Sequence, residues 1–221
     1  MRVELDAVAK GRRDLALPET TLSYRSRRAM LAVAETEQRP TVLGLIASGR
    51  MRPDRGTVMV DGAADPRRLR RTVALVDAPD VSDPAPNISV AAVVGEELMF
   101  AGRVADPLAA RRWLDEHGLR ALARIPIADV APAERLRIML ELVVLRPGVE
   151  ALVLVSPDRH GGDPRDWWAL AEEFAARGFA VLVIAGRAAR TALEQTSAVK
   201  PASARRPRPS GVRLRRIGGA S

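Results

Sequence analysis

Four continuous apolar runs recur along the chain, separated by more polar stretches. Short runs without polar alternation are typical of strands that are buried on both faces of a parallel sheet. The runs cover Met30–Ala34, Val73–Val76, Ala151–Val155 and Phe179–Ala185. The pattern therefore predicts four buried strands.

The stretches between these runs carry the punctuation of helices: a capping side chain, Pro in the first turn and Gly just past the end. Ser89 and Asp106 are the predicted caps of two helices. A later helix is predicted to bury Trp168, Leu170 and Phe174. The predicted helices cover residues 42–47, 88–102, 106–118 and 167–177.

The beginning of the chain is typical of an antiparallel arrangement. Val3, Leu5 and Val8 lie in a short apolar alternation, and the polar segment Lys10–Arg13 interrupts it as a hairpin turn would. A turn with Pro and Gly at residues 52–56 precedes another alternating strand.

The stretch from Met30 to Gly62 resembles the phosphate-binding unit of ATP-binding cassettes, the nucleotide-binding domains of ABC transporters. It reads as a strand, a turn, a helix and a second strand. The family's turn has the pattern GxxGxGK[ST], in which glycines let backbone N–H groups face the phosphates and Lys neutralises their charge. The same positions here read Val33-Ala34-Glu35-Thr36-Glu37-Gln38-Arg39-Pro40-Thr41.

This resemblance implies a vestigial phosphate-binding turn whose scaffold is kept and whose chemistry is lost. Arg39 and Thr41 are the candidate cofactor-binding residues, because they could still supply a charge and a hydroxyl. Glu35 and Glu37 would place negative charge beside a triphosphate, and two unit charges about 4 Å apart repel by roughly 4 kcal/mol at an effective dielectric of 20. Pro40 removes one backbone donor. We expect no ATP binding in the family's manner.

Two further landmarks of the family occur in order, again with changed residues. Ala78 stands where the family has a Gln that coordinates Mg²⁺ and the attacking water. The family's LSGGQ signature corresponds to Val130–Glu134, in which Ala131 lacks the Ser hydroxyl and Pro132 lacks a backbone N–H. The helix after the signature is expected to remain, and its anion site to be lost.

The catalytic acids and the His of the family are also replaced. Val155 and Ser156 stand where its Asp and Glu hold Mg²⁺ and polarise the water. Gly186 stands where its His senses the γ-phosphate. The resemblance thus implies that no catalytic residue and no cofactor are to be expected.

His160 offers a separate candidate for metal binding, together with Asp158 and Asp163. Three polar residues in an irregular loop are more often solvated, and we expect no metal there. The chain contains no Cys, which excludes disulfides and metal sites with Cys ligands.

The expected organisation is a cassette-like domain over residues 1–196 and a basic tail over residues 197–221. The expected fold is α/β and P-loop NTPase-like, with a parallel core sheet, an N-terminal antiparallel subdomain and a helical subdomain inserted at about residues 80–140. In the family that subdomain grips a transmembrane partner. The resemblance implies an integral, permease-like membrane partner, and a homodimer or heterodimer with another cassette.

Charge is unevenly distributed along the chain. The net charge is +8, and +7 of it lies after Ser197, where Arg, Pro, Ser and Gly dominate and no acid occurs. We expect this tail to be disordered, with weak attraction to anionic lipid or nucleic acid. No apolar run is long enough to span a bilayer, so we expect a cytoplasmic chain, at most peripheral on the inner face of the plasma membrane.

Three functions remain open from the sequence. The leading hypothesis is a degenerate ABC-type subunit, a pseudo-ATPase that acts as scaffold or regulator of a membrane complex. The alternative is a divergent but functional ATPase that binds Mg-ATP through Arg39. The third is a regulator that associates with nucleic acid through its basic tail.

Overall fold

The computed structural model describes residues 1–35 and 39–198, with side chains as far as Gln195. Three strands form an antiparallel sheet in the order β2-β1-β4: β1 (Arg2–Lys10), β2 (Leu17–Arg25) and β4 (Arg55–Val60). Val3 of β1 pairs with Tyr24 of β2 on one side and with Val60 of β4 on the other. The predicted antiparallel beginning of the chain is confirmed.

Four strands form the second sheet, in which all neighbours are parallel. Its order is β3-β7-β6-β5, with β3 (Arg28–Val33), β5 (Val73–Val76), β6 (Ala151–Val155) and β7 (Ala180–Ala185). Every residue of β5, β6 and β7 is buried, as their apolar sequences predicted.

The run Met30–Ala34 was predicted to form a buried strand, and this prediction is wrong about the burial. The strand exists as β3, but of its residues only Ala32 is buried. The reason is its place in the sheet, since β3 is an edge strand and pairs with β7 alone. An edge strand leaves one side without a parallel neighbour, which a pattern of apolar residues does not reveal.

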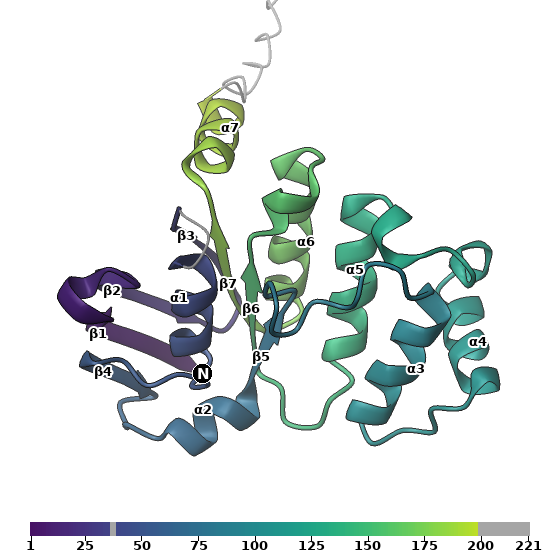
Figure 1. Ribbon diagram of the computed structural model, residues 1–221, viewed down its shortest axis with the longest axis horizontal. Helices are drawn as coiled ribbons and strands as arrows, with labels where there is room; N and C mark the ends of the chain where they lie inside the picture. The colour runs from purple at the N-terminus through teal and green to yellow at the C-terminus, as the bar shows by residue number, and fades with distance from the viewer. Residues whose placement is uncertain (36–38, 199–221) are drawn as a thin grey trace, which may run out of the picture.

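Helices lie on both faces of the parallel sheet and beyond its β5 edge (Figure 1). The α-helices are α1 (Arg39–Ala47), α2 (Pro66–Thr72), α3 (Val90–Phe100), α4 (Pro107–Glu116), α5 (Pro132–Val143), α6 (Pro164–Ala176) and α7 (Arg187–Ala198). Short 3-10 helices are η1 (Arg12–Asp14), η2 (Arg120–Leu122), η3 (Ile127–Asp129) and η4 (Pro157–His160). The predicted caps Ser89 and Asp106 are confirmed, since they accept hydrogen bonds from first-turn N–H groups at 3.3 and 2.7 Å. Asp163 caps α6 in the same way, at 2.9 Å.

One residue of α6 is less buried than predicted. Trp168 is half-buried, and its neighbour Trp167 is the buried tryptophan, with 3% of its surface exposed. Leu170 and Phe174, both buried as predicted, lie three and seven residues after Trp167 and therefore share its face of the helix. Trp168 is the next residue along the helix, so its side chain points away from that face.

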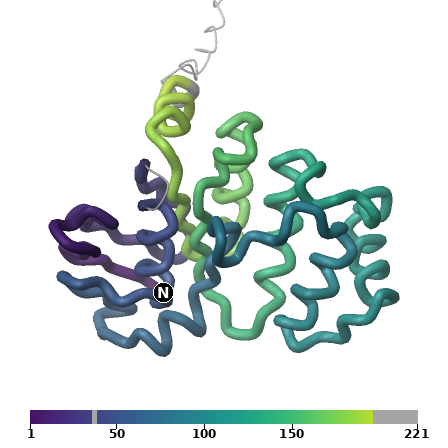
Figure 2. Tube along the Cα trace, in the orientation of Figure 1, coloured from purple at the N-terminus to yellow at the C-terminus, as the bar shows by residue number. Residues whose placement is uncertain are grey.

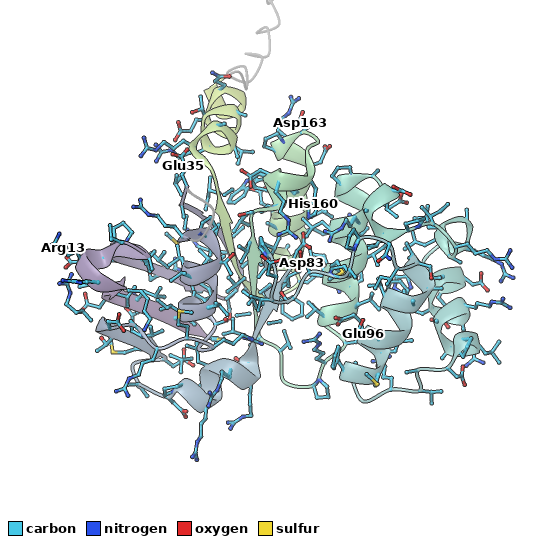
Figure 3. All side chains as sticks on the ribbon, viewed as in Figure 1. Arg13, Glu35, Asp83, Glu96, His160 and Asp163 are labelled. Carbon is cyan, nitrogen blue, oxygen red and sulfur yellow. The ribbon has the colours of Figure 1, made fainter. Side chains whose placement is uncertain are left out.

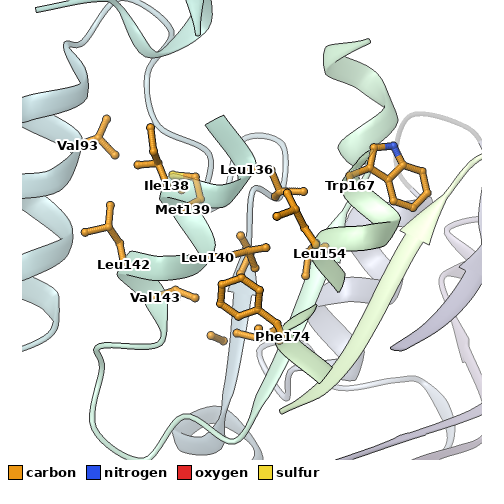
Figure 4. Close-up of a cluster of buried hydrophobic side chains, with 14 of the residues drawn as sticks. Val93, Leu136, Ile138, Met139, Leu140, Leu142, Val143, Leu154, Trp167 and Phe174 are labelled. Carbon is orange, nitrogen blue, oxygen red and sulfur yellow. The ribbon is translucent and has the colours of Figure 1, made fainter. Parts of the chain in front are cut away.

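The core consists of two clusters on opposite faces of the parallel sheet, because side chains alternate along each strand. In β6, Leu152 and Leu154 belong to the cluster with α3, α5 and α6, part of which Figure 4 shows. Val153 and Val155 belong to the cluster with α1 and the antiparallel sheet. The parallel sheet therefore contributes to both halves of the core.

The segment between β5 and β6 holds α3, α4 and α5, and α3 and α4 lie at the end of the molecule away from the antiparallel sheet (Figures 1 and 2). A helical subdomain was predicted at about residues 80–140, and its limits as a separate unit stay a prediction. Among the described residues, no helix combines the length and the apolar character that a membrane span requires.

Candidate functional site

The carboxyl ends of the four parallel strands meet at one edge of the sheet, where open α/β folds usually bind ligands. The residues that follow these ends are Glu35 near β3, Asp77 after β5, Ser156 after β6 and Gly186 after β7. Because the four strands run parallel, residues that are far apart in the sequence lie close together at this edge. We refer to this region as the carboxyl edge.

Asp77 is the centre of a charge network at the carboxyl edge, and its side chain is 2% exposed. Its Oδ2 atom accepts a hydrogen bond from Arg135 Nη1 at 2.7 Å and lies 2.9 Å from His160 Nε2. Arg159 Nη2 donates to the other carboxylate oxygen at 3.2 Å. Arg135 is the second buried member, with 5% of its side chain exposed.

The electrostatics of Asp77 result from two opposing effects. Burial raises the pKa of this carboxyl group, because a charge is less stable away from water. Hydrogen bonds from His160 and Arg135, together with the charges of Arg135 and Arg159, outweigh burial and hold the pKa below its usual value. Asp77 is therefore an ionised carboxylate matched by the cations around it.

The network fixes three segments to one another. Arg135 comes from the first turn of α5, whereas Arg159 and His160 come from η4, after β6. Arg159 also donates to the main-chain oxygen of Asp77, and it bonds Asp83 at 3.2 Å. Figure 3 shows Asp83 and His160 between the core strands and α5.

Ala78, the predicted position of the family's Gln, is fully buried. Its N–H donates to Ser82 Oγ at 3.1 Å, and its carbonyl oxygen accepts from Val81, Ser82 and Asp83 N–H groups. The segment after β5 is thus a closed turn.

The ends of β6 and β7 are joined by a second internal contact. Asp158 of η4 accepts a hydrogen bond from the N–H of Gly186 at 3.0 Å. Val155 is fully buried, and Ser156 adopts a left-handed conformation with φ 49°. Three positions predicted as replaced catalytic sites therefore lie next to each other, and none presents an acid.

The first turn of α1 holds the candidate cofactor-binding residues. Arg39 begins the helix and Thr41 lies half-buried two positions later, with Pro40 buried between them. Among the described residues, no carboxylate lies within 4 Å of the guanidinium of Arg39. Glu37 lies outside the described residues.

Glu35 is exposed, and its side chain bonds the beginning of α7. Its Oε1 accepts from the N–H of Arg187 at 3.1 Å, and its Oε2 lies 3.5 Å from Arg187 Nε. Glu35, Arg39 and Arg187 line one side of a pocket of about 470 Å³, whose other walls come from β2 and β3.

The helix after the signature position is present, as expected. Pro132 is the first residue of α5, and Ala131 precedes it without a side-chain bond to the helix. A Cβ atom added at Gly162 would lie 3.4 Å from Pro132, so the loop after η4 packs against this helix end.

The metal candidate receives no support from the geometry. His160 contacts Asp77, Asp158 bonds Gly186, and Asp163 caps α6 and pairs with Arg165. The described residues contain no group of three or more potential ligands that could hold a metal ion. The expectation that His160 is merely solvated is wrong, since only 27% of its side chain is exposed.

Sequence reasoning missed the network because its members are distant in the chain. Arg135 and His160 lie 58 and 83 residues from Asp77. One sequence signal was available, namely an acid directly after a fully apolar strand, at the edge where ligands bind. Nothing in the sequence identifies the cations that neutralise it.

This architecture is the fold of the ATP-binding cassette, the nucleotide-binding domain of ABC transporters. The chain resembles a nucleotide-free ATP-binding cassette from an ABC transporter with a TM-score of 0.60 and 14% identity, over 85% of this chain and 82% of that one. This confirms the expected fold class, with its parallel and antiparallel sheets.

Two further solved structures show the same likeness. One is cbiO1 from Clostridium perfringens, part of the ABC transporter complex cbiONQ (TM-score 0.57, 17% identity, 83% of this chain and 77% of that one). The other is a putative ABC transporter ATP-binding protein from Pyrococcus furiosus (TM-score 0.58, 13% identity, 84% and 92%). No protein-family model matches the sequence, and no curated protein matches it either.

Proposed function

We propose that the chain is an ABC-type subunit that does not hydrolyse ATP and that acts as scaffold or regulator of a membrane complex. The network around Asp77 carries this proposal. At the edge where cassettes hold Mg²⁺ and the attacking water, this chain has a carboxylate that is neutralised by Arg135 and Arg159 and that also bonds His160. Mg²⁺ needs oxygen ligands that are free to coordinate it.

The residues at the carboxyl edge do not fit a magnesium nucleotide. No acid follows β6 directly, and Asp158 is engaged by the backbone of Gly186. Glu35 adds negative charge near the turn that would hold the triphosphate. Without the glycine-rich backbone that faces phosphates, Arg39 alone would leave most of the negative charge of a triphosphate unmatched.

Exposed apolar side chains support docking through the segment between β5 and β6. Among the described residues, six of the seven large, exposed apolar side chains lie in this segment. They are Val81, Met99, Phe100, Val104, Leu108 and Ile125. Concentrated exposed apolar surface is typical of interaction sites.

A pocket of about 310 Å³ lies between α3, α5 and the turn after β5, and Val81 and Phe100 line it. The pocket would receive a short apolar element of the partner. Because cbiO1 is part of the complex cbiONQ, a membrane permease is the partner that we propose for this chain.

Titration with Mg-ATP tests the catalytic part of the proposal. We expect no heat of binding by calorimetry and no phosphate release, for the protein and for Arg39→Ala alike. Tight Mg-ATP binding that Arg39→Ala abolishes would overturn the proposal and favour the alternative of a divergent ATPase. Circular dichroism would verify that the variant is folded.

Affinity purification from membranes tests the docking part. We expect an integral membrane protein to copurify with the tagged chain and to be lost on Phe100→Asp. Leu15→Asp is the matched control, because Leu15 is also exposed, at 72%, but lies between β1 and β2. Equal loss for both variants, or recovery of soluble partners alone, would contradict this role.

A further inference from the structure

A second concave surface lies at the amino edge of the parallel sheet, away from the carboxyl edge. Since α1 starts near the carboxyl edge, its last turn returns to the amino edge, where Arg50 bonds the carbonyl oxygen of Val73 at the start of β5. The groove has a volume of about 1010 Å³. It is formed by the end of α1, the loop after it, β4 and α2. We call it the amino-edge groove.

The charge of this groove is unbalanced. Arg50, Arg52 and Arg70 line it, and no carboxylate of the described residues lies within 4 Å of their guanidinium nitrogens. Asp54 is the one acid in its lining, and it is already engaged by Lys10 Nζ at 2.5 Å and by the N–H of Gly11 at 2.9 Å. The groove therefore presents three unmatched positive charges.

Arg50 is held in place and crowded by other cations. Its Nη1 atom donates to the carbonyl oxygens of Ser48 at 3.2 Å and Val73 at 2.9 Å, which fixes the guanidinium without neutralising it. Burial, and then the charges of Arg146 and Arg70, lower the pKa of Arg50. An anion in the groove would relieve this repulsion between like charges.

The floor of the groove is apolar. Ile46 and Leu69 are buried beneath it, with 0% and 2% of their surfaces exposed, and Met51 and Val58 are half-buried at its wall. A ligand that fits both features has acidic groups for the Arg side chains and aliphatic groups for the floor.

The chemistry of the surface selects among possible occupants. The chain's own tail carries seven positive charges and no acid, so charge repulsion disfavours it. A membrane surface would meet the Arg side chains but could not reach apolar atoms at the bottom of a concave site. We propose that the amino-edge groove binds an acidic segment of a partner polypeptide that also carries aliphatic side chains.

This interaction site is independent of the proposed docking segment and of ATP hydrolysis. Arg suits such a role because its planar guanidinium matches a carboxylate through two parallel hydrogen bonds. Once its carboxylates are bound in this way, the segment would also cover the apolar floor and exclude water from it.

Fluorescence anisotropy with a short labelled peptide of Glu and Leu residues tests the proposal on the full chain. We expect binding that weakens as salt rises, because exposed charges are screened. Arg52→Glu and Arg70→Glu should each weaken it at least tenfold. Arg103→Glu is the matched control, since Arg103 is exposed, lies outside the groove and has no carboxylate partner among the described residues.

Two further peptides test the charge and the apolar part of the proposed ligand separately. A Lys and Leu peptide should fail to bind the wild-type chain but bind Arg52→Glu/Arg70→Glu, whose folding circular dichroism verifies. A Glu and Ser peptide should bind at least tenfold more weakly than the Glu and Leu peptide, because it lacks groups for the floor.

Absence of peptide binding, or equal loss on Arg103→Glu, would overturn the proposal. If phosphatidylserine vesicles, and not the peptide, bind in a manner that depends on Arg52 and Arg70, the groove is a lipid contact and the proposal is wrong. Failure of the ATPase or membrane proposals would not affect any of these outcomes.

Discussion

Asp77 adopts a left-handed backbone conformation, with φ 57°, while its carboxylate neutralises a buried arginine. Asn tolerates that conformation, so Asp77→Asn removes the charge and leaves the backbone unstrained. Arg135 would then be buried without a negative partner. We expect a loss of about 3 to 5 kcal/mol in the free energy of unfolding, measured by urea denaturation.

An exposed ion pair supplies the control for Asp77→Asn. Arg137 and Glu173 form a pair with two hydrogen bonds at 2.9 and 2.7 Å, but both side chains are more than 40% exposed. Glu173→Gln should cost at most about 1 kcal/mol. A cost for Asp77→Asn no larger than this would show that water reaches Arg135.

The same carboxylate predicts a dependence of stability on pH. The pKa of Asp77 is lower in the folded chain than its unfolded value of about 3.9, so its contribution is complete above that value. The contribution is lost as the pH falls through the lower, folded pKa. The facing groups are Arg135 from α5, Arg159 and His160 from η4, and Asp83 beyond Arg159.

Urea denaturation of the wild type and Asp77→Asn at several pH values measures this effect. The difference in their unfolding free energies should shrink as the pH falls below about pH 4, where Asp77 begins to lose its charge. Other carboxylates with lowered pKa values, such as Asp163 at about 2, occur in both proteins and largely cancel. A difference that grows on acidification would contradict the assignment.

At the scale of elements, two glycines within helices have opposite surroundings. A Cβ atom at Gly44 of α1 would lie 2.6 Å from Val155 Cγ2, because the helix packs closely on β6. At Gly95 of α3, the nearest such atom is the carbonyl oxygen of Ala105 at 3.6 Å. Gly44→Ala should therefore destabilise by about 1 to 3 kcal/mol through overpacking.

Gly95→Ala is the matched substitution, since it adds the same methyl group without a clash. We expect it to stabilise the fold by up to about 1 kcal/mol through helix propensity. Thermal unfolding should thus shift the two midpoints in opposite directions. If both variants stabilised the fold, α1 would have to lie farther from β6 than the 2.6 Å contact at Gly44 indicates.

Many of these elements could be predicted from sequence, because their signals are local. The runs at β5, β6 and β7 and the caps Ser89 and Asp106 needed no knowledge of distant residues. Burial of β3 could not be predicted, since it depends on the position of the strand within the sheet. The choice of Trp167 over Trp168 depended on the rotation of α6.

The candidate site could be predicted only in part. Spacing predicted the replaced positions, including Ser156 and Gly186, and the parallel strands bring these residues to one edge of the sheet. The partners of Asp77 are side chains from separate segments, and sequence patterns carry no information on such pairings. The charges that distinguish this edge were therefore visible only in the folded chain.

At the scale of the whole molecule, β6 and β7 join the two clusters of the core. Leu154 of β6 faces the cluster with α5, and Val155 next to it faces the cluster with α1. The Asp77 network adds a polar connection between the core and α5. The helical end and the antiparallel end should therefore unfold together.

Two fluorescent probes at opposite ends of the molecule measure this cooperativity. The three tryptophans, Trp113, Trp167 and Trp168, all report on the helical cluster. Because the chain has no Cys, Leu22→Cys in β2 can carry a single label that reports on the antiparallel sheet. In one labelled protein, both signals should give the same urea midpoint and slope, as two-state unfolding requires. Separate midpoints would show that the helical cluster unfolds independently of the antiparallel sheet, and that the shared strands do not couple the two.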